Sequence, residues 1–221
     1  MSMAGRVIIV GGGGFARELY HWVRDCTAAG TLPALGGYVD DAGSVLANAH
    51  KYDMPYLGGL ADCEIRPGDQ FVLALGSPSI KRMVQARLAD RGAAFATVIH
   101  PNTSVTATCE IGEGAIICPG CIIGPDARLG RFVTLNSGSG TGHDTSIGDF
   151  AVLAANIVVA GNAQVGEDAS IGSGAVILPG VKIGAGAIIG SGSVVYRSVR
   201  AGATIYAPPA KQLRLGKGAD G

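Results

Sequence analysis

One histidine, His143, stands in a segment whose composition suits catalysis. The segment is Asn136-Ser-Gly-Ser-Gly-Thr-Gly-His-Asp144, and its glycines would let a ligand or a neighbouring backbone approach closely. An imidazole can take a proton from an attacking amine or hydroxyl, and a neighbouring carboxylate can fix its tautomer. We therefore expect His143 to be a general base oriented by Asp144. Asp149 is the alternative orienting acid, because Asp144 reaches the ring only if the backbone turns there.

A second group of residues has the pattern of a phosphate-binding loop. Gly11-Gly-Gly-Gly-Phe-Ala16 fits G-x-G-x-x-G/A and lies between an apolar strand and an amphipathic helix. Backbone N–H groups at such a helix start bind phosphate without any net positive charge. Asp40-Asp41 close the second strand, where a carboxylate could bind a ribose or a base, and Gly76 follows the third strand.

This loop leaves two kinds of nucleotide ligand open. The acidic pair follows at a spacing that a nicotinamide dinucleotide site would allow, so an oxidoreductase is one alternative. The front part of the chain is shorter than 100 residues, which is half of a two-lobed dinucleotide fold. A single nucleotide, as in a nucleotide-sugar, therefore fits better.

The front part alternates predicted strands and helices, which indicates a small parallel sheet. We expect strands at 6–10, 36–40, 71–75 and 97–99. Helices are expected over 15–26 and 79–90, the second with Ile80, Met83, Val84 and Leu88 turned inward.

From residue 105 an internal repeat of six residues replaces this pattern. Fifteen of the sixteen repeat positions are branched aliphatics, and the exception, Thr141, falls in the segment that holds His143. Such a local break in a rule is where function is expected. The positions are Val105, Ile111, Ile117, Ile123, Leu129, Leu135, Thr141, Ile147, Leu153, Val159, Val165, Ile171, Ile177, Ile183, Ile189 and Val195.

A period of six suits neither a helix nor a simple strand, but it suits short strands joined by sharp turns. Three such strands close a triangular coil whose aliphatic side chains point inward, and stacked coils pair their backbones about 4.8 Å apart. We expect about five coils. The predicted fold class is α/β plus β-helix, with a small Rossmann-like domain over 1–100, a parallel β-helix over 101–211 and a tail over 212–221.

The same period predicts where a long ligand could lie. His143 is two positions past the inward column, so we expect it at a coil corner, facing outward. If a coil takes eighteen residues, Gly161 stacks on the same edge as His143, one coil apart, and Ser173 and Ser191 stack on another edge. All share this corner phase, and small corner residues expose backbone groups that a pantetheine chain could bind.

Composition and charge exclude several functions. The chain has 221 residues, 36 of them glycine, and its 17 basic and 17 acidic residues cancel. A zero formal charge gives no electrostatic footprint for nucleic acid or an anionic membrane, and no apolar run is long enough to span a bilayer. Three histidines would be needed for a zinc enzyme of the carbonic anhydrase type, so no metal is expected. The five cysteines suggest free thiols in a reducing cytoplasm.

The chain resembles the hexapeptide-repeat sugar acetyltransferases of the sialic acid O-acetyltransferase and nucleotide-4-aminosugar N-acetyltransferase group. The resemblance is carried by the Gly11–Ala16 loop, Tyr38-Val-Asp-Asp41, the hexad array, His143 seven residues after Asn136, and Pro209-Ala-Lys211. It implies a left-handed β-helix that binds acetyl-CoA, a front domain that binds a nucleotide-sugar, and a homotrimer with active sites between subunits.

Carried over to this chain, the resemblance implies a set of site residues. His143 would be the base and Asp144 its partner, with Asn136 beside the substrate. Acetyl-CoA would contact Gly161, Ser173 and Ser191. The nucleotide-sugar would be held by Gly13, Gly14, Phe15, Asp40, Asp41 and Gly76.

The implied reaction is direct attack of a sugar amino group on the thioester of acetyl-CoA. The acceptor would be a nucleotide-linked 4-amino-4,6-dideoxy sugar. Some members have histidine in place of Phe15, and the aminosugar enzymes have a second histidine where this chain has Val152. The UDP or GDP carrier, the sugar and the acyl group therefore stay open. The alternatives are O-acetylation of sialic acid or another sugar hydroxyl, and a nucleotide-binding scaffold without catalysis.

Overall fold

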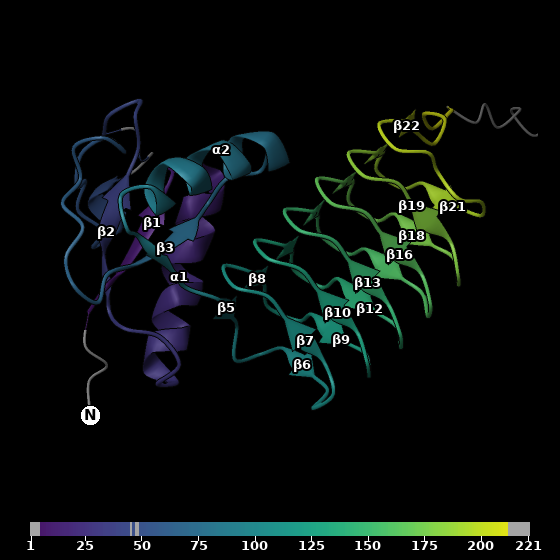
Figure 1. Cartoon of the computed structure of the whole chain (residues 1–221), viewed down its shortest axis with the longest axis horizontal. Helices are drawn as coiled ribbons and strands as arrows, with labels where there is room; N and C mark the ends of the chain where they lie inside the picture. Colours follow the sequence, from purple (N-terminus) through teal and green to yellow (C-terminus); the bar gives the residue numbers. More distant parts are fainter. Residues whose placement is uncertain (1–4, 45, 47–48, 212–221) are drawn as a thin grey trace, which may run out of the picture.

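The computed structural model describes residues 5–44, 46 and 49–211, and it consists of two parts in chain order. A small α/β part comes first in the chain, and a stack of coils extends from it (Figure 1). The predicted tail over 212–221 lies outside the described residues.

The α/β part contains one parallel sheet in the order β2-β1-β3-β4. Two α-helices, α1 (Gly14–Ala28) and α2 (Pro78–Ala89), follow the first and third strands, and a short 3-10 helix spans Ala49–Lys51. The alternation predicted from the sequence is confirmed. The strands are β1 (Val7–Val10), β2 (Leu35–Val39), β3 (Gln70–Leu73) and β4 (Ala94–Phe95).

Two expectations for this part are wrong. The strand expected over 97–99 does not join the front sheet; β5 (Val98–Ile99) pairs with Ile116 and Ile117 of the β-helix instead. In α2, Ile80 and Met83 are 49% and 53% exposed. The helix buries Lys81, Val84 and Leu88, because it packs on the β-helix as well as on the sheet.

The second part is a parallel β-helix with three faces. Face 1 contains seven strands, face 2 six and face 3 five, so there are about six coils where five were expected. Face 1 is β5, β8 (Ile116–Ile117), β11 (Thr134–Leu135), β14 (Val152–Leu153), β17 (Ser170–Ile171), β20 (Ile188–Ile189) and β22 (Thr204–Ile205). Face 2 is β6 (Ser104–Val105), β9 (Ile122–Ile123), β12 (Gly140–Thr141), β15 (Val158–Val159), β18 (Val176–Ile177) and β21 (Val194–Val195). Face 3 is β7 (Glu110–Ile111), β10 (Arg128–Leu129), β13 (Ser146–Ile147), β16 (Gln164–Val165) and β19 (Lys182–Ile183).

The interior of the β-helix is the predicted aliphatic column. From β5 to β21 the paired strands lie eighteen residues apart, as in Leu135 with Leu153 and Ile147 with Val165. The last pair is shorter, because Ile188 of β20 pairs with Thr204 of β22. The column is buried from Ile117 onward, and Thr141 is buried with it at 5% exposure. At the first coil the column is less covered, and Val105 is 38% exposed.

The corners between strands adopt the left-handed backbone conformation at a regular spacing. Glycine fills many of these positions, and seven are filled by other residues with φ between 56 and 60°. Asn and Asp tolerate this conformation, whereas a bulky side chain there costs roughly 1–2 kcal/mol. Phe132 and Phe150 occupy two such corners.

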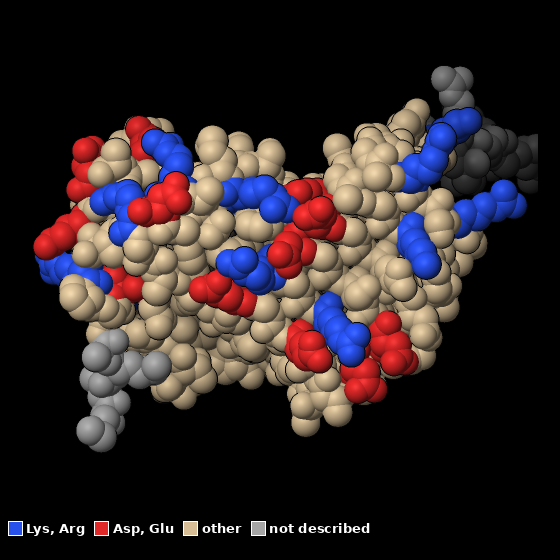
Figure 2. Space-filling view, viewed as in Figure 1, with Lys and Arg blue, Asp and Glu red and all other residues tan. Residues whose placement is uncertain are grey.

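These two phenylalanines join the two parts of the molecule. Phe132 contacts Phe95 of the front sheet edge-on and stacks on Phe150, with both pairs of ring centroids 5.0 Å apart. Arg82 of α2 lies 4.2 Å from the centre of the Phe150 ring and pairs with Asp168 at 2.7 Å and Glu167 at 3.1 Å. Basic and acidic side chains are accordingly interspersed where α2 meets the coils (Figure 2).

Lys81 is a buried cation at the same junction. It is 1% exposed, and its Nζ donates to the Thr134 hydroxyl at 2.6 Å and to the Phe132 carbonyl at 3.1 Å. Burial disfavours the charged amine and lowers the pKa of Lys81 to about 7. The neutral amine still supplies both hydrogen bonds, so the junction keeps its contacts at alkaline pH.

The stability of the protein should therefore rise with pH through Lys81. Above about pH 7 the unfolded chain binds more protons at this lysine than the folded protein does, which adds up to about 1.4 kcal/mol per pH unit. Urea unfolding between about pH 7 and about pH 9.5 measures this slope. Lys81→Met should remove it and the exposed-site control Lys182→Met should keep it; equal slopes in the wild type and Lys81→Met would contradict the assignment.

Candidate functional site

His143 lies on the outer rim of a coil, as expected. It occupies the corner between β12 on face 2 and β13 on face 3, and its side chain is 59% exposed. Its Nδ1 lies 2.8 Å from Oδ2 of Asp144. Asp144 has φ of 56°, and this turn of the backbone brings its carboxylate back onto the preceding ring.

The structure thereby decides between the two orienting acids. Asp144 contacts the imidazole, whereas Oδ1 of Asp149 accepts a hydrogen bond of 2.8 Å from the backbone N–H of Arg131 at a different corner. A carboxylate on Nδ1 favours the tautomer in which Nε2 carries the free lone pair. Nε2 of His143 makes no hydrogen bond within the part of the chain that the structure describes, so it is free to accept a proton.

Gly161 lies beside the His143 ring, one coil further along the same corner. A Cβ built on Gly161 would lie 2.5 Å from Nε2 of His143. We define the His143 edge as the corner between faces 2 and 3, represented by Pro125, His143, Gly161 and Pro179. The structure therefore brings Gly161 together with His143, as the corner phase predicts.

The other predicted β-helix residues lie on a different edge. Asn136, Ser173 and Ser191 fall at the corner between faces 1 and 2, which we call the serine edge. Oδ1 of Asn136 accepts a hydrogen bond of 2.7 Å from the Ser137 N–H, and both serines are exposed. Within one chain, face 2 separates these residues from His143.

Thr141, which breaks the aliphatic column, does not take part in the His143 pair. It points into the coil, and its hydroxyl accepts a hydrogen bond of 3.3 Å from the Gly124 N–H. The break in the column therefore falls in the segment that holds the His143–Asp144 pair, but Thr141 itself faces the interior.

In the α/β part, the glycine loop lies where the predicted motif requires. It joins the end of β1 to the start of α1, and Gly13 is the N-cap of that helix without any side chain capping it. Gly13 and Gly14 are exposed, so the first N–H groups of α1 face outward. Gly11 has φ of 107°, a conformation that glycine adopts readily.

Both predicted acidic residues are occupied by contacts within the domain. The Asp40 carboxylate accepts hydrogen bonds from the N–H of Gly12 at 2.7 Å and of Ala42 at 2.8 Å. Asp41 accepts one from the Leu60 N–H at 2.7 Å and lies 3.5 Å from Arg87. These carboxylates therefore shape the glycine loop and the strand ends from within.

A hollow of ≈ 180 Å³ opens at this edge of the sheet. Its wall is mainly apolar, and it lies where the carboxyl ends of the parallel strands converge, the usual ligand position in such sheets. Gly76 is exposed after β3, whereas Phe15 packs on Trp22 with ring centroids 6.0 Å apart. The hollow is lined by Val10, Gly11, Val39, Asp40, Asp41, Leu60, Leu75, Ile80, Met83, Val84 and Arg87.

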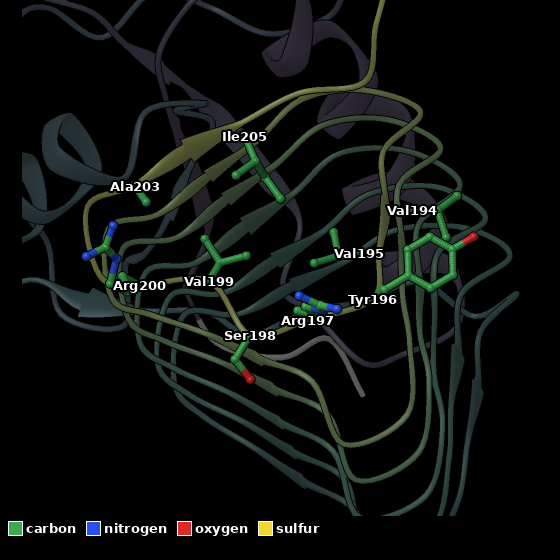
Figure 3. Close-up of a pocket in the computed structure, with 9 residues that line it drawn as sticks. All are labelled: Val194, Val195, Tyr196, Arg197, Ser198, Val199, Arg200, Ala203 and Ile205. Carbon is green, nitrogen blue, oxygen red and sulfur yellow. The ribbon is translucent and has the colours of Figure 1, made fainter.

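Another hollow, of ≈ 460 Å³, lies at the open C-terminal end of the β-helix. Figure 3 shows Val195, Val199 and Ile205 on the inner side of the last coil, with Arg197 across the opening. It contains none of the predicted site residues and reflects the exposed end of the stack.

The remaining histidines lie far from the His143 edge in the sequence and have separate surroundings. His100 bonds Asp25 at 3.1 Å across the junction, and His21 and His50 are exposed. Across residues 5–44, 46 and 49–211, the structure contains no group of three or more His, Cys, Asp or Glu placed to hold a metal. No helix in these ranges is long and apolar enough to cross a membrane.

Two features of the structure, one at the His143 edge and one at the junction of the two parts, have little or no signal in the sequence. The contact between His143 and Gly161 spans one coil, so it follows from the period only once the coil length is known. The burial of Lys81 has no periodic signal, because lysine in a helix normally faces water.

Asp40 should be needed for the shape of the glycine loop. Replacing it with Ala leaves two N–H groups without their carboxylate, which should cost about 1–3 kcal/mol of unfolding free energy in urea. Asp40→Asn keeps one acceptor oxygen and should cost less, and the exposed Asp62→Ala should cost little. Equal stability of Asp40→Ala and the wild type would refute this role.

Known proteins share the repeat and the fold of this chain. The family described as "Bacterial transferase hexapeptide (six repeats)" matches residues 144–178 and 162–197. A search of curated protein sequences gives no significant match. Similar solved structures include PerB from Caulobacter crescentus in complex with CoA and GDP-perosamine, at 29% identity and a TM-score of 0.81, over 94% of this chain and 97% of that one.

Two further solved structures share the fold over nearly the whole of this chain. A variant of perosamine N-acetyltransferase from the same organism, with CoA and GDP-perosamine, is 26% identical with a TM-score of 0.70, over 94% of this chain and 96% of that one. The acetyltransferase domain of PglB from Neisseria gonorrhoeae, with acetyl coenzyme A, is 23% identical with a TM-score of 0.82, over 96% of this chain and all of that one. This chain thus combines the hexapeptide repeat of bacterial transferases with the α/β plus left-handed β-helix fold of sugar N-acetyltransferases, which confirms the resemblance seen in the sequence.

Proposed function

We propose that this protein transfers an acetyl group from acetyl-CoA to the amino group of a nucleotide-linked 4-amino-4,6-dideoxy sugar. The observation that carries the proposal is the exposed His143–Asp144 pair, joined at 2.8 Å, on a β-helix similar to proteins bound to CoA and GDP-perosamine. The amine attacks the thioester carbonyl, the new C–N bond forms, and the C–S bond of acetyl-CoA breaks.

His143 takes the proton that the attacking amine must lose. Asp144 holds Nδ1, stabilises the imidazolium that forms, and leaves Nε2 toward the acceptor. The proton then passes to the departing thiolate of CoA, which leaves as the thiol.

The tetrahedral oxyanion needs a hydrogen-bond donor. The Gly161 N–H has no acceptor within the part of the chain that the structure describes, and it lies on the same edge as the base. We assign it this role. Removing one such donor costs roughly 3–4 kcal/mol in enzymes where this has been measured.

The nucleotide-sugar is assigned to the edge of the front sheet. The open start of α1 at Gly13 and Gly14 would receive the diphosphate, and the apolar hollow beside Asp40, Asp41 and Gly76 would receive the nucleoside. The half-buried Phe15 supports this site from the first turn of α1. A cytoplasmic location for this reaction stays a prediction.

A homotrimer would complete the active site. Face 2 presents an outward stripe of Ile122, Val158 and Val194, which are 61%, 50% and 47% exposed. Such a stripe is typical of an interface between chains. Face 2 lies between the His143 edge and the serine edge, so copies that pack through it would place the base of one chain near Asn136, Ser173 and Ser191 of another, with acetyl-CoA between them.

His143→Ala should lower kcat by about 10²–10⁴-fold without unfolding the protein, because it removes the base from an exposed corner. Thiol release from acetyl-CoA, measured against a panel of UDP- and GDP-4-amino-4,6-dideoxy sugars and free sialic acid, gives both the rate and the acceptor. His50→Ala, which changes an exposed histidine outside the site, should keep the wild-type rate.

Normal turnover of His143→Ala would remove this residue from the mechanism. Turnover with sialic acid alone would replace N-acetylation by O-acetylation at the same site. No thiol release with any acceptor, together with tight nucleotide-sugar binding by calorimetry, would favour a scaffold.

Val158→Asp should dissociate the trimer, because it places a charge in the centre of the apolar stripe. The matched control is Gln164→Asp, on the outer side of face 3. Analytical ultracentrifugation and thiol release should show loss of assembly and activity together in the first variant only. An active monomeric Val158→Asp would show that one chain holds a complete site.

A further inference from the structure

We propose that Gly161 is a positioning residue for the base. Because glycine has no side chain, the space beside the Gly161 backbone is free, and the His143 imidazole lies in that space. This inference rests on the proposed function, and it assigns Gly161 a steric role in addition to its N–H. Three ring atoms lie close to the place where a side chain would begin. A Cβ on Gly161 would be 2.5 Å from Nε2, 2.8 Å from Cε1 and 2.9 Å from Cδ2 of His143.

The corner itself does not require glycine. The backbone of Gly161 does not adopt the left-handed conformation, which falls on the next residue, Asn162. The same phase holds Ala155 and Ala185 at the corners of other coils. The backbone of the repeat therefore accommodates a Cβ at this corner position. At position 161 a Cβ would clash with the ring of His143.

The coils cannot move apart to make room for both groups. The Asn162 N–H donates to the His143 carbonyl at 2.9 Å, and the Asp144 N–H donates to the Pro125 carbonyl at 3.0 Å. These bonds tie the corner to its neighbours on both sides. An added methyl group must therefore displace the ring rather than the backbone.

A displaced ring would lose its contact with Asp144. The 2.8 Å distance between Nδ1 and Oδ2 exists because the ring is held between the carboxylate and the flat surface of Gly161. Rotation about the side-chain bonds would move both nitrogens at once. Nε2 would then no longer face the position where the acceptor amine is expected.

Gly161→Ala tests this role without removing the oxyanion donor, because alanine keeps the N–H. We expect kcat to fall by about 10²-fold, the cost of a misplacement of roughly 1 Å in a catalytic group. The KM for acetyl-CoA should change little, since the lost interaction acts on the transition state. Steady-state thiol release with the best acceptor of the panel gives both values.

A double-variant cycle isolates the ring as the cause. When His143 is already Ala, adding Gly161→Ala should lower neither kcat nor the melting temperature further, because the space is then empty. In the presence of His143 the same substitution should lower the melting temperature. Ala185→Gly, at the same phase on the edge between faces 3 and 1, controls for the exchange of glycine and alanine at a corner.

The outcomes separate this inference from the proposed function. Full kcat in Gly161→Ala, with His143→Ala inactive, would overturn the steric role and leave the base assignment standing. Equal loss of melting temperature in both backgrounds would also overturn it, because the methyl group would then clash with the coil itself. Full kcat in His143→Ala would instead overturn the proposed function.

Discussion

Hydrogen bonds between the strands of successive coils fix the positions of the corner residues along the β-helix. From β5 to β21 the paired strands are parallel and eighteen residues apart, so a corner position in one coil lies over the same position in the next. This register lets the Gly161 backbone support a ring that belongs to His143. A shift by one residue would turn the aliphatic column outward, so burial of the column protects the geometry of the corners.

Several left-handed corners carry side chains that make contacts beyond the repeat itself. Most of them use glycine, for which the conformation has little cost. At Asp144 the same conformation directs a carboxylate onto the neighbouring imidazole. At Phe132 and Phe150 it directs aromatic rings toward the front domain. The packing of Phe132 with Phe95, and of Phe150 with Phe132 and Arg82, offsets the strain of a bulky residue at these corners.

The triangular coil also explains why the predicted residues divide between two edges. A ligand as long as acetyl-CoA needs contacts along several coils, and His143 and the two serines lie on either side of one apolar face. In the front domain, the carboxylates of Asp40 and Asp41 are directed at backbone N–H groups of the loops around them. They line the hollow and also hold the backbone of the loops around it in place.

The sequence by itself determined the architecture. A period of six, sustained by fifteen aliphatic residues in sixteen positions, predicts a β-helix, and a glycine loop between a strand and a helix predicts a small α/β domain. It also indicated His143, because that segment breaks the local rule. Only the tertiary structure decided that Asp144 rather than Asp149 contacts the ring of His143. It also decided that Lys81 is buried while Ile80 and Met83 are exposed, and that Asn136 lies on another edge from His143. These depend on side-chain directions at corners and on how α2 packs against the coils, and a one-dimensional pattern contains neither.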